Sequence, residues 1–333
     1  MTDTLHPRDA FQLEGAEAQE TAFLEAISRG RMHHAWLLTG PEGVGKATFA
    51  FRAARRLLGA APDLGNGILG SLGSDPVTRQ VAARSHPDLM VLERVGEDGK
   101  LRKVIPVEEA RRLPEFFSQT PAMSPYRVAI IDAADDLNVN SANAILKTLE
   151  EPPPRGVIFL VSHAPGRLLP TIRSRCRRLT FTAPGEAMTV DFLTARDGAL
   201  THDQAERLAK MAGGAPGLAL RLAAADALGA DDAAHEILRN LPRLDEGALM
   251  LLADSFRGAE GQGRFDLLLD RLAARIHDMA VGQAMAGVGE GLDRWVLAWD
   301  RLRVLPDQTE GLNLDRADAF WTAMRDLRSA AAA

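Results

Sequence analysis

The chain has 333 residues, of which 46% are hydrophobic and 25% are charged, and its formal net charge at pH 7 is −6. This composition is typical of a globular protein with two or three domains. The acidic balance excludes a broad basic surface, so contact with nucleic acid must be local or supplied by partners. The single cysteine, Cys176, excludes a disulfide framework and a cysteine-based zinc site, so we expect no metal cluster. The sequence lacks an apolar run long enough to cross a membrane and lacks a secretory signal at its start, so we expect a cytoplasmic protein without a membrane partner.

Short apolar runs alternate with helical patterns through the first half of the chain. Helical spacing predicts helices at 47–59 and 107–117, and Pro114 could introduce a kink in the second. The segment 59–84 is rich in Gly and Pro and predicts a long loop with a short helix near its end. Strands separated by helices predict a parallel sheet with helical crossovers. The runs that predict buried strands are 34–40, 88–95, 126–135, 156–162 and 177–184.

The strand patterns end near Pro184, and the rest of the chain has helical spacing. Residues 188–223 are helical and are interrupted by the turn GGAPG at 213–217. Four amphipathic helices are then predicted at 246–256, 264–280, 292–305 and 315–327. We therefore expect an α/β domain at 1–183, a small helical domain at 186–228 and a larger helical domain at 231–330.

The stretch LLTGPEGVGKATFA at 37–50 follows a predicted strand and leads into a predicted helix. Gly40, Gly45 and Lys46 match the phosphate-loop pattern G-x-x-x-x-G-K-[ST]. Glycines at these places, and at Gly43 between them, allow backbone N–H groups to surround a phosphate. The helix N-terminus and the lysine add favourable positive charge. The stretch therefore predicts a loop descended from a phosphate-binding one.

Two residues that ATP hydrolysis requires are missing from this pattern. The residue after the lysine should carry a hydroxyl that holds Mg²⁺, but it is Ala47, and Thr48 lies about 100° further round the helix. Asp132 ends a predicted strand where an acidic residue would hold Mg²⁺, but the next residue, the general base of related ATPases, is Ala133. These residues leave nucleotide binding open and predict no efficient hydrolysis.

The stretch NVNSANAILKTLEEPPPRG at 138–156 predicts an amphipathic helix that is ended by prolines. Its SANAILKTLEEPP portion, together with TIRSRC at 171–176, resembles the clamp-loader branch of the AAA+ ATPases. HHAWLLTGPEGVGKATFA and the HPDL stretch at 86–89 narrow the resemblance to the delta-prime family of bacterial DNA polymerase III. The resemblance is dense over the α/β domain, and in the helical half it is limited to the layout, the GGAPG turn and LNLDR at 312–316.

The resemblance implies a fold, a function and partners. It implies an AAA+ RecA-like P-loop domain at 1–183, followed by a helical lid at 186–228 and an all-α collar at 231–330. It implies a stator of the complex that loads the sliding clamp onto primed DNA. The expected partners are the gamma/tau and delta subunits, the clamp and primed DNA, with ATP or ADP as the ligand of the glycine loop. Such a subunit of the DNA polymerase III holoenzyme is not expected to be catalytic alone.

The resemblance also assigns individual residues. In the family a Ser-Arg-Cys motif presents an arginine to the nucleotide of the neighbouring subunit, so Arg175 is expected to be an arginine finger acting in trans. The alternative is that Arg175 merely belongs to a solvated cluster of arginines. The degenerate nucleotide site would comprise Gly40, Gly43, Gly45, Lys46, Thr48 and Asp132, and the subunit interface would include Ser174, Cys176, Asn143, Lys147 and Glu150.

Three other functions compete with this interpretation. The first is an ATP-hydrolysing, gamma/tau-like clamp-loader subunit, and Ala47, Ala133 and Leu218 argue against it, the last because active loaders carry an arginine at that place. The second is a nucleotide or small-molecule kinase, which the SANAILKTLEEPP helix argues against. The third is a scaffold without a role at any active site. Some family members carry a four-cysteine zinc module after the first helix, and 59–84 has no cysteine for one.

Overall fold

A computed structural model describes residues 6–95, 101–196, 198–258, 261–287 and 291–332 of the chain. Contacts within the chain separate two compact units, Asp3–Leu220 and Arg221–Ala333. The first five residues of the predicted α/β domain lie outside the described residues, and the finer division into three domains stays a prediction.

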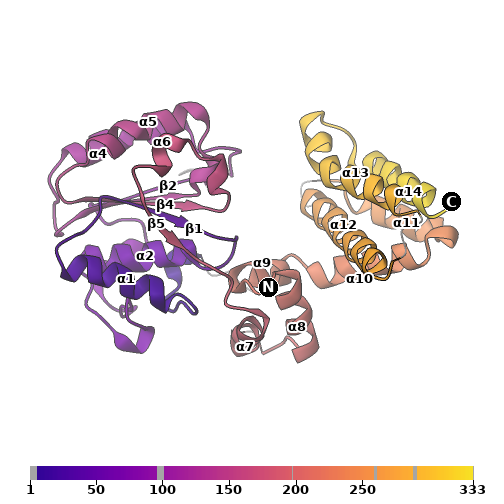
Figure 1. Cartoon of the computed structure of the whole chain (residues 1–333), viewed down its shortest axis with the longest axis horizontal. Coiled ribbons are helices and arrows are strands. Elements are labelled where there is room, and N and C mark those ends of the chain that lie inside the picture. The colour runs from indigo at the N-terminus through magenta and orange to yellow at the C-terminus, as the bar shows by residue number, and fades with distance from the viewer. Residues whose placement is uncertain (1–5, 96–100, 197, 259–260, 288–290, 333) are drawn as a thin grey trace. The chain divides into compact units, whose positions relative to one another are not determined.

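A parallel sheet of five strands in the order β2-β3-β4-β1-β5 organises the first unit (Figure 1). All adjacent strands are parallel, so the predicted fold class and all five predicted strands are confirmed. Two strands are shorter than predicted. The third ends at Asp132 because a 3-10 helix follows at Ala134–Asp136, and the last ends at Thr180, opposite Thr39 at the end of its partner β1. The strands are β1 (Ala35–Thr39), β2 (Leu89–Glu93), β3 (Arg127–Asp132), β4 (Gly156–Ser162) and β5 (Arg177–Thr180).

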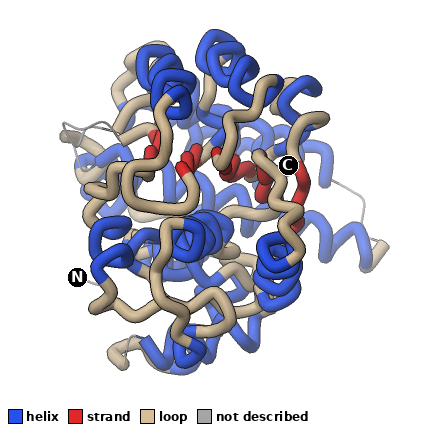
Figure 2. Tube along the Cα trace, turned by 90° about the vertical axis from the view of Figure 1, so that its left-hand side faces the viewer, coloured by secondary structure: helices blue, strands red, loops and turns tan. Residues whose placement is uncertain are grey.

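Helices cover both faces of this sheet, and Figure 2 shows the strands in one layer between them. Side chains alternate along each strand, so Trp36 and Leu38 pack in one apolar cluster with α1 and α2, whereas Leu37 packs in the other with α4 and α5. The helices are α1 (Glu17–Ser28), α2 (Lys46–Leu57), α3 (Pro76–Ala82), α4 (Val107–Ser118), α5 (Val139–Glu150), α6 (Pro170–Arg173), α7 (Glu186–Arg196), α8 (His202–Met211) and α9 (Pro216–Ala224).

The Gly- and Pro-rich segment 59–84 is held by polar contacts to the helices beside it. Its predicted short helix is present as α3, whose first turn is capped by the Asp75 carboxylate. Arg52 of α2 forms a buried ion pair of 2.8 Å with Glu20 of α1, and the same carboxylate accepts the Leu69 N–H at 3.3 Å. This buried pair anchors the segment at the place where some family members are expected to have a zinc module.

The turn between α8 and α9 contains Gly213 and Gly214, both with a positive φ. A Cβ atom at Gly214 would lie 2.7 Å from the backbone carbon of Gly185, so the close approach of the two segments requires glycine there. The predicted interruption of the helical pattern is therefore present and has a steric cause, but it spans 212–215, because α9 already begins at Pro216.

The second unit consists of helices packed around a cluster of aromatic side chains that includes Phe256, Phe265 and Phe320. The four predicted helices are present, but α13 continues through Pro306 to Gly311, whereas the sequence predicted an end at residue 305. The proline removes one backbone donor, and the burial of Leu302 and Thr309 holds the helix on both sides of it. The helices are α10 (Ala227–Arg239), α11 (Glu246–Asp254), α12 (Gly261–Met285), α13 (Leu292–Gly311) and α14 (Arg316–Ala331).

Within the described ranges, no helix is both long enough and apolar enough to cross a membrane.

Candidate functional site

The glycine loop connects β1 to α2 at the carboxyl edge of the sheet. Gly40, Gly43 and Gly45 all have a positive φ, and Gly45 is the N-cap of α2. A Cβ atom at Gly40 would lie 2.2 Å from the carbonyl oxygen of Phe181, so the loop also needs glycine for space. The loop therefore uses glycines at turns that other residues would strain, and it ends at the N-terminus of α2, where the first N–H groups of a helix have no partner within the helix.

Lys46 is 2% exposed and is held by groups of its own chain. Its Nζ donates hydrogen bonds to the carbonyl oxygens of Gly40, at 2.7 Å, and of Pro41, and it lies 2.9 Å from Nδ1 of His163. Burial lowers the pKa of Lys46 to about 8. The contact with His163 could not be predicted from the sequence, because the two residues are 117 positions apart.

Asp132 lies at the end of β3 and faces the loop lysine. Burial raises the pKa of Asp132 to about 6, the Glu93 carboxylate adds to the rise, and the positive charge of Lys46 opposes it. Ala133, the next residue, is buried and offers no group that could activate water. The carboxylate expected beside Mg²⁺ is thus in place, and the expected general base is missing.

Asp135, three residues beyond Asp132, has a structural task. Its carboxylate accepts hydrogen bonds from the Ser162 hydroxyl at 2.9 Å, from the His163 N–H at 2.6 Å and from the Ala164 N–H at 3.2 Å. These bonds fix the loop after β4 and occupy the one hydroxyl at the end of that strand. Asp135 therefore stabilises this loop rather than serving the glycine loop.

The start of α9 packs directly on the glycine loop, within the first unit. The Gly217 N–H donates a 2.8 Å hydrogen bond to the Gly43 carbonyl oxygen. A Cβ atom at Gly43 would lie 2.2 Å from the backbone nitrogen of Leu218. The chain therefore places an apolar residue against the loop at the position where the family resemblance predicts an arginine.

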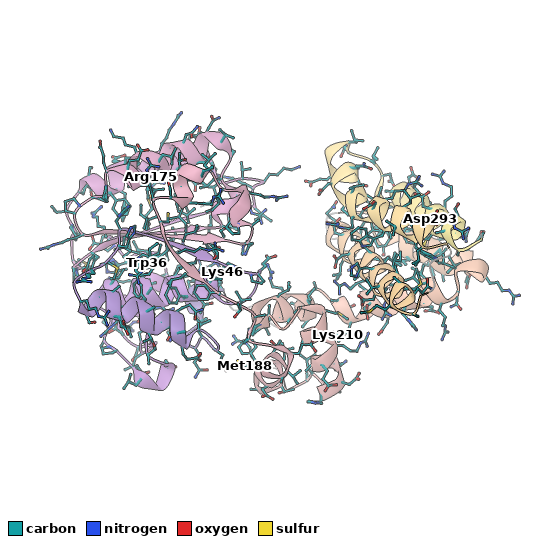
Figure 3. The ribbon with its side chains drawn as sticks, in the orientation of Figure 1. Trp36, Lys46, Arg175, Met188, Lys210 and Asp293 are labelled. Carbon is teal, nitrogen blue, oxygen red and sulfur yellow. The ribbon has the colours of Figure 1, made fainter. Side chains whose placement is uncertain are left out.

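Arg175 lies on another part of the unit, just after α6, and Figure 3 shows it well away from Lys46. Its side chain is 35% exposed. One terminal nitrogen, Nη1, donates to the Thr171 carbonyl oxygen at 3.0 Å, and the other, Nη2, lies 2.9 Å from Oε1 of Glu150. The guanidinium is therefore oriented by its own chain and remains accessible to solvent.

The other predicted interface residues surround this arginine or lie on the same helix layer. Cys176 packs against the apolar cluster under α5, and burial raises the pKa of its thiol to about 12, so the thiol is inert. Ser174 donates to the Thr171 carbonyl oxygen at 3.2 Å. Asn143, Lys147 and Glu150 are exposed on α5.

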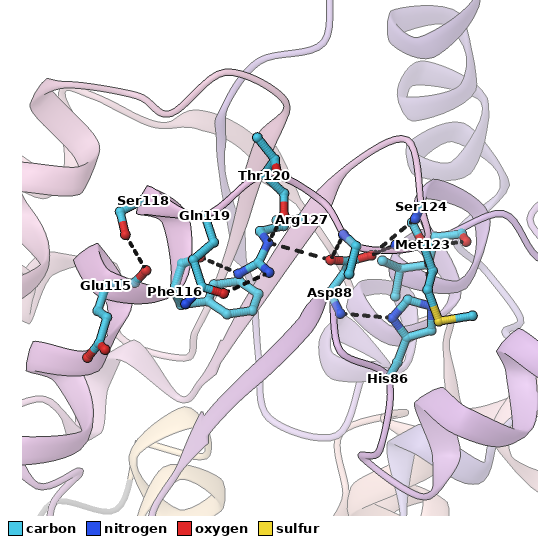
Figure 4. Close-up of polar contacts among 12 residues, drawn as sticks. His86, Asp88, Glu115, Phe116, Ser118, Gln119, Thr120, Met123, Ser124 and Arg127 are labelled. Carbon is cyan, nitrogen blue, oxygen red and sulfur yellow. Dashed lines mark hydrogen bonds and ion pairs between the residues drawn. The ribbon is translucent and has the colours of Figure 1, made fainter.

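The HPDL stretch builds a buried network before β2 (Figure 4). The Asp88 carboxylate accepts backbone N–H groups from residues 122–124 at 2.7–3.1 Å and lies 3.5 Å from Nε of Arg127. His86 accepts the Asp88 N–H at 3.1 Å and contacts the Ser124 hydroxyl at 3.3 Å. This stretch, which carried part of the family resemblance, stabilises the loop before β3.

The loop residues fit a phosphate group better than they fit a Mg²⁺–nucleotide. A glycine loop at a helix N-terminus suits a phosphate even though Lys46 is held by its own chain, but Ala47 packs against the apolar cluster where a Mg²⁺ ligand would stand. Thr48 is half-buried one position further along α2. In the part of the chain that the structure describes, no group of three or more His, Cys, Asp or Glu residues could hold a metal ion.

The strand order and the glycine loop after β1 together define a P-loop α/β protein of the AAA+ type. A family model described as "DNA polymerase III, delta subunit" matches residues 15–185. This match covers more than half of the chain, and the chain belongs to that family.

Curated relatives agree with this assignment over the same region. The chain is 36% identical over 204 residues to DNA polymerase III subunit delta' of Pseudomonas aeruginosa, which covers 61% of this chain and 60% of the relative. It is 33% identical to subunit delta' of Escherichia coli over 58% of this chain and 55% of the relative. It is 37% identical to subunit gamma of Buchnera aphidicola over 47% of this chain and 40% of the relative. The chain thus matches only about half of the length of such relatives.

A crystal structure of a DNA polymerase III gamma subunit-related protein from Thermotoga maritima has a similar fold. Its TM-score is 0.51 at 19% identity, over 93% of this chain and 99% of that chain. At this identity the similarity supports the fold alone, and it extends across both units.

Proposed function

We propose that this chain is a delta-prime-type clamp-loader subunit that donates Arg175 to the ATP site of a neighbouring subunit and does not hydrolyse ATP itself. The observation that carries the proposal is the half-exposed Arg175 guanidinium, which lies apart from the chain's own glycine loop (Figure 3). An arginine that served the chain's own site would have to face Lys46. An arginine presented outward is within reach of a second molecule, which supports the proposal.

The state of the glycine loop supports the second half of the proposal. Ala47 provides no Mg²⁺ ligand, Ala133 provides no base, and Lys46 is hydrogen-bonded to carbonyl oxygens of its own loop. A general base alone contributes a factor of about 10²–10⁴ to a rate. The loop would therefore act as a folded element, or as a phosphate-binding element without turnover.

The chemistry of phosphoryl transfer supports the first half. Negative charge spreads over the oxygens of the transferred phosphoryl group, and a planar guanidinium stabilises it, by a factor of about 10³–10⁵ in related enzymes. The ion pair that orients Arg175 is solvent-exposed and therefore weak, about 0–1 kcal/mol, so a phosphate can engage the same guanidinium.

Gamma- and tau-type partners are suggested by the names of the relatives, and the other proposed partners come from the family resemblance. The neighbour that receives Arg175 would be a gamma- or tau-type subunit, and the assembly would include a delta subunit, the sliding clamp and primed DNA. The formal charge of −6 is consistent with a stator whose contact with DNA is local or supplied by its partners. The exposed Asn143, Lys147 and Glu150 of α5 would lie in the interface with a neighbour.

A gamma/tau-like, ATP-hydrolysing subunit is the second candidate. Sequence similarity to proteins named subunit gamma and subunit tau favours it. It requires Mg²⁺ to be held without the hydroxyl that Ala47 lacks and water to be activated without a base at Ala133.

The test is the ATPase rate of a loader reconstituted from this chain and its partners, in the presence of clamp and primed DNA. Arg175→Ala should lower kcat by more than about tenfold. Arg173→Ala, two residues away and exposed, removes the same charge and should change kcat by less than about twofold. Equal rates for the two variants would leave Arg175 in a solvated cluster and the chain as a scaffold.

A further inference from the structure

Glu150 and Arg175 are brought together by two helices that share one apolar cluster. Glu150 is the last residue of α5, and Arg175 follows the end of α6 by two residues. The neighbouring side chains Leu149 and Ile172 are 2% and 0% exposed and belong to the same cluster. The backbone positions of both charged residues are therefore fixed by buried neighbours, although their own side chains are 48% and 35% exposed.

The two contacts of the Arg175 guanidinium leave most of its donors without a partner among the residues that the structure describes. A guanidinium carries five N–H groups in a fixed plane. One bond goes from Nη1 to the Thr171 carbonyl oxygen at 3.0 Å and one from Nη2 to Glu150 at 2.9 Å. Two contacts on different nitrogens fix the plane of the group, and the other N–H groups remain available for a second acceptor.

We propose that Glu150 is a positioning residue for Arg175 in the trans reaction. The inference rests on the function proposed above, and it concerns the orientation of the finger before the neighbour's nucleotide arrives. A free arginine side chain loses rotamer entropy when it is fixed on a phosphate. Glu150 and the Thr171 carbonyl restrict that freedom in advance, so less of it is lost in the transition state.

The exposure of the pair sets the size of the effect. Exposed ion pairs contribute about 0.2–1 kcal/mol, which corresponds to a factor of about 1.4–5 in rate. We therefore expect Glu150→Ala to lower kcat of the reconstituted loader by about two- to fivefold, with KM for ATP unchanged. Glu150→Gln keeps an oxygen acceptor at the same distance from the backbone, so its kcat should be close to that of the wild type. Glu151→Ala is the matched control, because it removes the same charge at the next residue.

The decisive experiment is a double-mutant cycle of Glu150→Ala and Arg175→Ala in the reconstituted loader. If Glu150 acts through Arg175, the double variant is as slow as Arg175→Ala alone. An equal loss in both backgrounds would mean that Glu150 only supports the fold, and it would overturn the inference. No loss, or a gain, on Glu150→Ala would overturn it too, a gain because Glu150 would then be competing with the phosphate. A loader that tolerates Arg175→Ala would refute the proposed function itself, and the inference with it.

Discussion

Two aspartates of the sheet, the buried Asp88 before β2 and the half-buried Asp132 at the end of β3, differ in how their charge is held. Three backbone N–H groups and Arg127 surround Asp88. Burial alone would raise the pKa of Asp88, but these hydrogen bonds and the Arg127 charge outweigh burial and hold the pKa below its usual value. Burial instead raises the pKa of Asp132 to about 6, although Lys46 opposes the rise.

This difference in pKa distinguishes the Asp88 network, which stabilises the sheet, from the surroundings of Asp132, which retain part of a nucleotide site. A carboxylate with a lowered pKa stabilises the fold when ionised, and one with a raised pKa destabilises it when ionised. The chain thus retains a costly aspartate beside the loop lysine, in a site that lacks the Mg²⁺ hydroxyl and the base. If that site is silent, changes there should alter stability and leave the loader's rate intact.

The largest effect on stability is expected at Asp88. Asp88→Ala leaves Arg127 buried without its charge partner and should lower the free energy of unfolding by about 3–5 kcal/mol. Asp191→Ala, at an exposed position, is the control for the lost charge. Hydrogen exchange of the β2 and β3 amides measures the effect on the first unit alone. Because the folded pKa of Asp88 is lowered, its contribution is present above pH 4 and should disappear as the pH falls through the folded pKa. A loss below about 1 kcal/mol would show that the network is not a main support of the sheet.

A smaller effect is expected where α9 packs on the glycine loop. Gly43→Ala puts a Cβ atom 2.2 Å from the Leu218 nitrogen at a φ of +76°, and it should lower the free energy of unfolding by about 2–3 kcal/mol. Gly30→Ala has a similar φ, +62°, but open space around it, so it measures the backbone strain alone. Urea denaturation of both variants would separate the cost of the steric clash with Leu218 from the cost of backbone strain. Equal losses would mean that α9 moves away from the loop at little cost.

The smallest effect is a gain in stability at Asp132. Its folded pKa lies above its ordinary value, so wild-type stability falls as the pH rises from about 4 to about 6 and stays lower above that. Asp132→Asn removes this penalty, whose upper limit is about 3 kcal/mol with the attraction to Lys46 already included in the folded pKa, and we expect a gain of about 1–2 kcal/mol at pH 7. Thermal unfolding at pH 4 and pH 7 should show a gain only at pH 7. A variant that is less stable at pH 7 would contradict the account of a penalised carboxylate.

The sequence predicted most of the fold because its signals are local. Runs such as 156–162 are apolar at every position, as a strand covered on both faces must be, and the glycines of the loop mark its turn. Helix α1 was not predicted, and its N-cap, Ala16, makes no side-chain hydrogen bond that would mark its start. The end of α13 was wrong because burial on both sides of Pro306 outweighs the lost hydrogen bond.

The sequence identified the residues of the candidate site, but it did not identify the residues that contact them. The loop pattern identified Lys46, and the resemblance identified Arg175. The partners of these two side chains, His163 and Glu150, are separated from them in the sequence and become neighbours only when the strands and helices pack. A local pattern cannot indicate such pairs, so the orientation of the finger and the saturation of the loop lysine required the structure.

The most direct test of the central claim compares Lys46→Met with Arg175→Ala in this chain, within the reconstituted loader. Both variants should assemble, as size-exclusion chromatography would check, and the clamp- and DNA-stimulated ATPase rate is then measured. The account predicts that Lys46→Met retains the rate within about twofold and that Arg175→Ala loses more than about tenfold. The reverse pattern would contradict it, because this chain would then hydrolyse ATP at its own glycine loop.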